Sequence, residues 1–156
     1  MSDAIRTLQA AVLAEIPLAR AMQLRLRDYT GDCLTIAAPL APNINDKGCA
    51  FGGSLVSLLT LAGWSLIVLN LRELDRECDV YVQDSNVRYL APVWDDFTAQ
   101  ARLAEGESWD AFAATLAARG RARLTVDCRV PLADGTDACT LQARFVAISK
   151  SRIASP

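Results

Sequence analysis

Histidine is missing from the 156-residue chain, and this absence narrows the chemistry that the protein can perform. Without histidine there is no Ser-His or Cys-His pair to activate a nucleophile, and no His-ligated metal site. Catalysis would have to use carboxylates, hydroxyls, thiols, amides or backbone dipoles. We therefore expect neither a metal nor a bound cofactor.

An excess of basic residues is also lacking. Lysine and arginine number 16 against 18 aspartate and glutamate residues, which gives a net charge of −2. Binding to a phosphate backbone requires a clear positive surplus, so nucleic acid is not an expected partner. The five cysteines form no C-x-x-C pair, and their odd number argues against a disulfide framework. We interpret them as small buried apolar residues.

Charge is absent from Gly48 to Leu71, a stretch of 24 positions that is long enough to span a bilayer. Glycine, serine, threonine and asparagine dilute its hydropathy, and no second segment of this kind exists to pack beside it. A helix that is apolar on all sides can equally form the centre of a domain. We favour a buried helix over a membrane span. Because the first residues show no apolar signal segment, we expect a cytoplasmic protein.

Alternation of apolar and polar residues predicts several half-buried strands, and helical spacing predicts two further helices. A helix that Ser2 or Asp3 caps should end before Pro17, and a second should run from Ser108 to Arg119 and stop at Gly120. Strands with one wet face form antiparallel sheets, and one all-apolar helix is about what the other face can wrap. We predict a single α+β domain over residues 1–156. The expected strands are Met22–Leu26, Cys33–Ala38, Cys78–Pro92, Phe97–Leu103, Ala122–Val130 and Cys139–Ala147.

The segment NINDKGCAFGGSL, residues 43–55, leads into the long apolar helix. Gly48 and Gly53 have the spacing of a phosphate-binding Walker A loop, but Ser54 stands where that motif needs lysine. A helix start also presents free N–H groups with about half a positive charge. The N–H groups of Gly52, Gly53 and Ser54 could therefore hold the oxyanion formed when water attacks a carbonyl. Alternatively, the glycines only allow close packing, while Asn45 or Asp46 caps a turn.

Three motifs give the chain its resemblance to a known family. They are N-x-x-G-x-x-F-G-G-S from Asn45 to Ser54, the helical Ala62-Gly63-Trp64, and NVRYLAPV from Asn86 to Val93. Together they resemble a hotdog-fold thioesterase, and more closely the thioesterase domain at the C-terminus of YiiD-type proteins. The resemblance extends from about Ile16 to Ser149.

The resemblance implies a curved antiparallel sheet around one central helix, and a homodimer joined along sheet edges with acyl sites at the interface. Pairing of dimers into tetramers stays open. The implied substrate is an acyl thioester of coenzyme A or acyl carrier protein, so coenzyme A or phosphopantetheine enters as part of the substrate. Asn45 would position water or substrate, and Gly53 would offer its N–H to the thioester carbonyl. Phe51, Gly52 and Ser54 would line the same site.

Two departures from the family pattern concern the catalytic base. Many hotdog thioesterases have a histidine directly before the glycine pair and a carboxylate about two turns along the helix. This chain has Phe51 and Thr60 at those positions, and threonine cannot deprotonate water near neutral pH. Thr60 is therefore expected to contact substrate only.

Asp84 is the carboxylate that best fits the missing base. In a regular strand it shares a face with Val80 and Val82, and a carboxylate on an apolar face needs a partner or a purpose. Arg88 lies on that same face, so an Asp84–Arg88 ion pair is an equal alternative. Asp46 is a second candidate, with capping as its more ordinary role. Ser85 would contact the ligand only if a bulge reverses the strand.

We therefore predict direct attack of water on the thioester, with Asp84 as general base, Asn45 orienting the water, and the helix N–H groups stabilising the oxyanion. The first alternative is a non-catalytic module that binds acyl-coenzyme A or acyl carrier protein. A hotdog dehydratase is a second, although that chemistry relies on histidine. Arg119, Arg121, Arg123 and Arg129 either attract coenzyme A phosphates or, as we favour, solvate the sheet.

Overall fold

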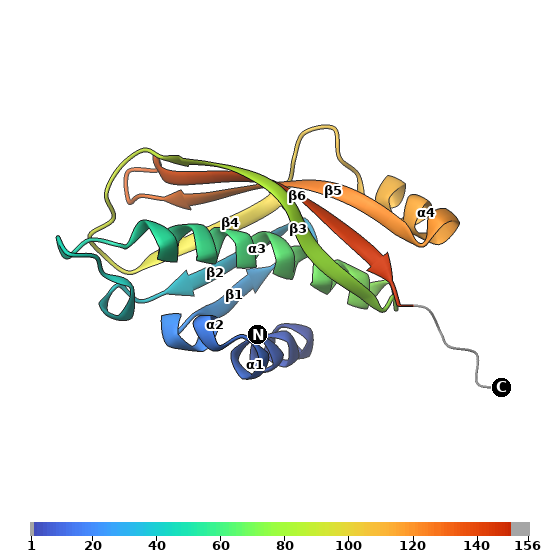
Figure 1. Ribbon diagram of the computed structural model, residues 1–156, viewed down its shortest axis with the longest axis horizontal. Coiled ribbons are helices and arrows are strands. Elements are labelled where there is room, and N and C mark those ends of the chain that lie inside the picture. Colours follow the sequence, from blue (N-terminus) through green and yellow to red (C-terminus); the bar gives the residue numbers. More distant parts are fainter. Residues whose placement is uncertain (1, 151–156) are drawn as a thin grey trace.

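The protein is built on a six-stranded antiparallel sheet that curves around one long helix, α3 (Figure 1). The computed structural model describes residues 2–150, so Met1 and residues 151–156 of the expected domain lie outside it. The strand order is β1-β2-β4-β5-β6-β3. This confirms the α+β hotdog architecture. The strands are β1 (Arg25–Tyr29), β2 (Cys33–Ala38), β3 (Cys78–Tyr89), β4 (Phe97–Leu103), β5 (Arg121–Pro131) and β6 (Asp137–Ser149).

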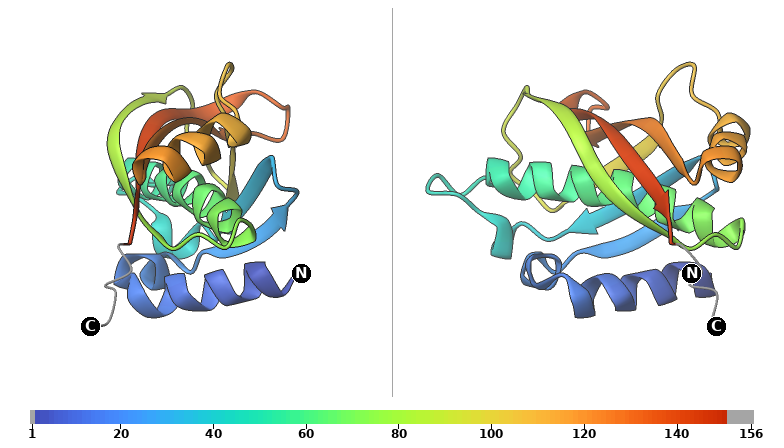
Figure 2. Two further views of the ribbon diagram at one scale, coloured as in Figure 1. Left: turned by 90° about the vertical axis from the view of Figure 1, so that its right-hand side faces the viewer. Right: turned by 45° about the vertical axis from the view of Figure 1, so that its right-hand side comes forward.

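Helix α3 (Gly52–Glu73) is the uncharged segment that the sequence singled out. It is long and apolar enough to cross a membrane, but both views in Figure 2 show it inside the curve of the sheet. Leu58, Leu59 and Leu66 are fully buried there. At Gly63 an added Cβ would lie 3.0 Å from the Phe145 ring of β6, so the glycine permits close approach of helix and sheet. Helix α3 is thus the core helix of a globular domain.

The N-terminal segment forms two helices that cover the side of α3 next to β1 (Figure 1). Ser2 caps α1 (Asp3–Glu15) by accepting a hydrogen bond from the N–H of Ile5, as expected. Pro17 does end α1, but it also occupies the first turn of a short second helix, α2 (Pro17–Met22). The expected strand at Met22 is therefore wrong at its start. The chain leaves α2 through Gln23, which is left-handed at φ 57°, and β1 begins only at Arg25.

The remaining helices connect strands. A 3₁₀ turn, η1 (Ala41–Asn43), follows β2, and α4 (Trp109–Arg119) follows β4. The Ser108 hydroxyl caps α4 at its start, and Gly120 ends it in the left-handed conformation. Both ends were predicted from the sequence.

The sheet has an apolar inner face against α3 and a polar outer face. On β5, and on β6 from Cys139 to Ile148, the buried residues alternate with exposed or half-buried ones, so Leu124, Phe145 and Ala147 face the helix. Arg123 and Arg144 face outward. The strands expected at Ala122–Val130 and Cys139–Ala147 are thus confirmed, each slightly longer than predicted.

Strand β3 breaks the alternation at one position. Val82 pairs with Phe145, but the next paired residue is Asp84, opposite Arg144, so Gln83 is an extra residue in a β-bulge. A bulge shifts the phase of side chains beyond it by one position. Ser85 and Val87 consequently pair with Ala143 and Leu141 on the inner face. The strand also ends at Tyr89, three residues before the expected Pro92.

Candidate active site at the start of helix α3

The start of α3 is held in place by backbone hydrogen bonds from two other segments. The Ala50 N–H donates to the Val93 carbonyl at 2.8 Å, and the Phe51 N–H donates to the Asn43 carbonyl at 2.7 Å. Ile44 and Ala50 form an isolated antiparallel bridge. The glycine pair therefore enters the helix from a fixed loop rather than from a free one.

Asn45 organises that loop with its side chain. Its Oδ1 accepts hydrogen bonds from the N–H groups of Lys47 at 2.8 Å and Cys49 at 3.2 Å. This is the turn-capping role that the sequence left open beside the catalytic one. Asp46 is exposed and forms an ion pair with its neighbour Lys47 at 3.0 Å. Both residues lie in the loop before the helix, and neither is brought into a buried polar cluster.

The first three N–H groups of α3 have no acceptor among residues 2–150. Phe51 is the N-cap residue, and its apolar side chain cannot accept a hydrogen bond; the first backbone bond of the helix runs from Leu55 to the Phe51 carbonyl. Gly52, Gly53 and Ser54 are half-buried. A 22-residue helix thus presents three free donors and the positive end of its dipole at a sheltered position. Such donors suit the oxygen of a polarised carbonyl.

Two aromatic rings wall these donors. A Cβ on Gly53 would lie 2.3 Å from Cε1 of Phe51, and a Cβ on Gly52 would lie 3.3 Å from Cε1 of Tyr89. Both rings are themselves more than half exposed, at 54% for Phe51 and 59% for Tyr89. A side chain at Gly53 would therefore displace the Phe51 ring, and one at Gly52 would press on the Tyr89 ring. The result is a polar donor set with an apolar rim.

A separate apolar groove lies beside the helix, beginning about one turn after the donors. Val56, Ser57 and Thr60 follow Gly53 on one face of α3 at helical spacing, and with Leu61 they line a groove of about 250 Å³. Ile16 and Leu18 close it from the N-terminal helices. The Thr60 hydroxyl donates to the Val56 carbonyl at 2.8 Å. Because this hydroxyl is already paired, Thr60 contributes to an apolar wall.

The bulge at Gln83 changes the placement of the two strand residues expected near the ligand. Asp84 pairs with the outward-facing Arg144, so the expectation that it shares a face with Val82 is wrong. Arg88 does share the outer face with Asp84, but no ion pair joins them among the described residues. Ser85 lies on the inner face, as the sequence required of a bulged strand.

Distance also separates Asp84 from the donors. The Tyr89 ring lies next to Gly52, at the start of α3. Asp84 is five residues before Tyr89 on β3, which at about 3.3 Å per residue places it about 16 Å from Tyr89. The Asp84 carboxylate therefore lies on the outer face of the sheet, far along β3 from Tyr89. The N–H of Gly53 lies beside Tyr89, on the inner side. Its role as general base stays a prediction, and the geometry argues against it.

The two buried thiols of the inner face, Cys128 and Cys139, are expected to be weak nucleophiles. Burial raises the pKa of Cys139 to about 11 and, with the nearby Asp127 carboxylate, raises the pKa of Cys128 well above its usual range. Both thiols stay protonated near neutral pH. Among residues 2–150 no three cysteine, aspartate or glutamate side chains converge as metal ligands do.

The structure thus brings together Phe51, Gly52, Gly53 and Ser54, with Thr60 two turns along the same helix face. It adds Tyr89, which sequence reasoning recognised only as part of a motif. Its position after the bulge, pairing with the buried Cys139, turns its ring toward the helix start. Asp84 is not part of this group.

Comparison with known proteins agrees with this architecture. A family model described as "Putative thioesterase (yiiD_Cterm)" matches residues 5–149. A solved protein of unknown function from Chlorobaculum tepidum TLS is 26% identical, with a TM-score of 0.86 over 93% of this chain and 94% of that one. A "putative thioesterase" from Shewanella oneidensis is 27% identical, with a TM-score of 0.84 over 95% and 99%. A "probable thioesterase" from Pseudomonas aeruginosa, 23% identical with a TM-score of 0.77 over 92% and 96%, shares the fold.

Proposed function

Because the chain belongs to the thioesterase family named for the C-terminal domain of YiiD, we propose that it hydrolyses an acyl thioester of coenzyme A or of acyl carrier protein. The products are a carboxylic acid and the free thiol of the carrier. One observation carries this proposal: three N–H groups at the start of α3, which find no acceptor in the described part of the chain, lie within an apolar rim. A thioester has the same two parts, a polar carbonyl and an apolar chain.

The N–H of Gly53, with those of Gly52 and Ser54, would bind the thioester oxygen and the oxyanion that follows attack by water. Loss of one such donor typically costs a factor of about 10² to 10³ in kcat, or about 2.7–4 kcal/mol. A bound acyl chain, together with the rings of Phe51 and Tyr89, would exclude water from these donors and so strengthen each hydrogen bond.

The acyl chain would lie along the groove beside α3. Gly53 and Thr60 are seven residues apart, about 10 Å along a helix, and Val56 and Leu61 supply the apolar contact between them. Leu18, which is 56% exposed, lies at the same groove and would be covered by the chain. This length favours short to medium acyl chains.

A homodimer would complete the site through the free edge of β3. Only β6 pairs with this twelve-residue strand in the described part of the chain, so its other edge offers a row of unpaired backbone groups. Tyr81 and Val82 are exposed on it. Antiparallel pairing of two β3 strands would set the first residues of one strand beside Tyr89 of the other, and hence beside its glycine pair.

The base would then come from the partner subunit. Two carboxylates lie near the start of β3. Asp79 lies opposite Ile148 on the outer face, and its carboxylate is 3.7 Å from the Lys150 ammonium. Glu77 precedes the strand, so the strand does not assign its side chain to the outer face. We assign the base to Glu77 of the partner and keep Asn45 as the residue that orients the water through its amide. Asp46 would contact only the carrier end of the substrate, and Ser85 would contact the ligand from the inner face of β3.

A non-catalytic acyl-binding module is the second candidate. The observation in its favour is that no carboxylate of the described residues shares the helix face of Gly53 and Thr60. Such a module would use the same donors and groove to hold a thioester without cleaving it.

A panel of acyl-coenzyme A substrates of increasing chain length tests both functions. Loss of the thioester is followed by its ultraviolet absorbance, which avoids interference from the five protein cysteines. We expect turnover that Glu77→Gln abolishes and Asp84→Asn preserves. Saturable binding without hydrolysis in the wild type would establish the binding module, and absence of both binding and hydrolysis would refute the proposal.

A further inference from the structure

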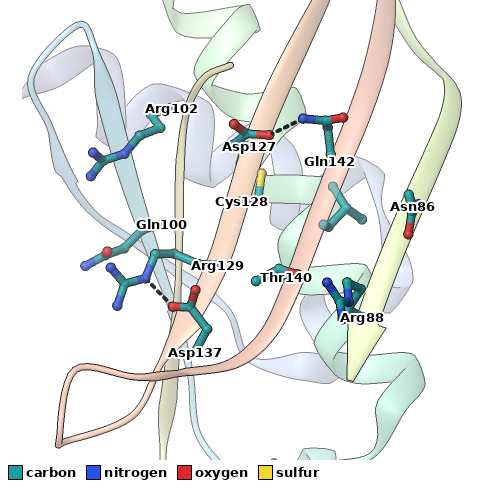
Figure 3. A pocket seen from close by; sticks show the side chains of 11 residues that line it. Asn86, Arg88, Gln100, Arg102, Asp127, Cys128, Arg129, Asp137, Thr140 and Gln142 are labelled. Carbon is teal, nitrogen blue, oxygen red and sulfur yellow. Dashed lines mark hydrogen bonds and ion pairs between the residues drawn. The ribbon is translucent and has the colours of Figure 1, made fainter. Parts of the chain in front are cut away.

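The outer face of the sheet contains a hollow of about 360 Å³ that the thioester site does not use (Figure 3). We call it the outer-face hollow. Its floor is the backbone around Cys128 of β5 and Leu141 of β6, and longer polar side chains from β3, β4, β5 and β6 rise around it. Its volume lies at the lower end of the range for small-molecule sites.

Strand register places four of its residues in one row. Arg88 pairs with Thr140, Thr140 with Arg129, and Arg129 with Gln100. Neighbouring strands lie about 4.8 Å apart, so the two arginine Cα atoms flank the threonine at about 10 Å from each other. The short Thr140 side chain between two long ones is what creates the hollow. Figure 3 shows the side chains of Arg88, Thr140 and Arg129 on the same face of the sheet.

One arginine of the row is held in a fixed orientation. The Nε of Arg129 lies 2.7 Å from Oδ1 of Asp137, and its Nη2 donates to the Gly135 carbonyl at 3.0 Å. These contacts use one side of the guanidinium, and the Nη1 donors have no partner among residues 2–150. A guanidinium held in this way loses little further freedom when it binds a ligand.

The other charges around the hollow leave a surplus of donors. Arg88 and Arg102 form no ion pair among the described residues, whereas the Asp127 carboxylate accepts from the Gln142 amide at 2.8 Å. Asp137 is already paired with Arg129. Both carboxylates are thus engaged, while two guanidinium groups have free donors. The hollow is cationic in a chain whose net charge is −2.

We propose that the outer-face hollow binds a small molecule through a phosphate or carboxylate oxyanion. The oxyanion lies between the guanidinium groups of Arg88 and Arg129 and accepts a hydrogen bond from the Thr140 hydroxyl. Guanidinium forks match the geometry of both anions, and such charge-assisted hydrogen bonds are about twice as strong as neutral ones.

This binding site is separate from the thioester site. Arg88 and Tyr89 are consecutive on β3, so their side chains lie on opposite faces: the ring at the start of α3 and the guanidinium on the outer face. A molecule in the hollow cannot contact the N–H groups of Gly52–Ser54 of the same protomer. The proposal therefore does not depend on hydrolysis of a thioester.

Isothermal titration calorimetry at constant ionic strength tests the proposal, with inorganic phosphate and malonate as separate probes and chloride as the blank. We expect saturable binding of at least one probe, and the stronger of the two identifies the preferred oxyanion. Arg88→Ala should weaken it by at least about tenfold, and Thr140→Val by about threefold to tenfold, because each removes a donor.

Arg144→Ala is the matched control. Arg144 lies on the same face and the same strand as Thr140 but does not line the hollow, so its loss should change affinity by less than about twofold. An equal loss in Arg144→Ala and Arg88→Ala would indicate general attraction to a basic face and overturn the proposal. Absence of saturable binding of either probe would overturn it as well.

Discussion

The inner and outer faces of the sheet differ in how strongly packing restricts the residues that each can carry. Each inner-face residue of β5 and β6 touches the core around α3, and close contacts such as Gly63 with the Phe145 ring leave little freedom. On the outer face, Arg88, Arg123 and Arg144 are exposed. The inner face is therefore fixed by volume, whereas the outer face is free to vary in charge.

Strand β3 shows what determines the face on which a residue lies. Before the bulge, Val80 and Val82 face the helix; after it, Ser85 and Val87 do. A single extra residue, Gln83, exchanges the faces of every residue that follows. The side of the sheet on which a carboxylate acts thus depends on local register as much as on the residue itself.

The largest expected contrast between the faces is in stability. Phe145→Ala should lower the free energy of unfolding by about 3–5 kcal/mol, because it opens a cavity beside Gly63 in the core. Arg144→Ala, at the preceding residue on the outer face, should change it by less than about 0.5 kcal/mol. Urea unfolding of both variants measures the difference, and similar losses would contradict the assignment of faces.

The next contrast concerns the N–H donors at the N-terminal end of α3. Gly53→Ala should lower kcat/KM by about 10² to 10³, because its Cβ meets the Phe51 ring at 2.3 Å and shields the N–H. Stability should change little, since Phe51 is exposed and can rotate away.

The double variant Phe51→Ala/Gly53→Ala separates the two causes. If shielding of the N–H is responsible, the double variant stays inactive. Recovery of activity would attribute the loss to displacement of the ring. Steady-state kinetics on one acyl-coenzyme A substrate decides between them.

Thiol reactivity should also distinguish the faces. Cys33 pairs with Arg102 on the outer face, whereas Cys128 and Cys139 are buried on the inner one. With the pKa of Cys139 near 11 instead of 9.0, its thiolate fraction at pH 8 is about 100-fold smaller. Iodoacetamide should therefore label Cys33 well before Cys139, as mass spectrometry of the folded protein would show.

The same raised pKa values imply a pH dependence of stability. In the unfolded chain these thiols ionise near pH 9, while in the folded protein they remain protonated to higher pH. The unfolded state thus loses protons first, so the free energy of unfolding should fall as the pH rises above about 9. Replacing Cys128 or Cys139 by Ala should reduce this slope, and an unchanged slope would assign it to other groups.

The smallest expected effect is at Asp84. Asp84→Asn should change turnover by less than about twofold, because the carboxylate lies on the outer face, away from the donors. A loss comparable to that of Gly53→Ala would return Asp84 to the mechanism, with the carboxylate supplied by the second subunit of the proposed homodimer.

The sequence was sufficient for most of the fold because hydrophobic spacing determined it. The bounds of β2, the extent of α4 with its stop at Gly120, and the uncharged helix α3 were all predicted from local pattern. The start of β1 was not, since Pro17 both ends one helix and begins another, and alternation in Met22–Leu26 concealed the turn at Gln23.

The site was less predictable because it depends on contacts between distant segments. The donors at Gly52–Ser54 follow from a helix start, but the ring of Tyr89 reaches them only through strand register. One sequence signal of the bulge existed. Val87 is five residues after Val82. Side chains in a regular strand share a face only at even spacing, so both valines can face the helix only if one residue between them is extra.

Helix α3 also has a consequence for synthesis of the chain. Its 22 residues leave the ribosome before strands β3 to β6, which cover much of it and end only at Ser149. At about 5–20 residues per second, several seconds pass before those strands exist. During that interval the nascent chain exposes a helix with the length and hydropathy of a membrane segment. Chaperone holding on the ribosome should therefore matter more for this protein than its size alone suggests.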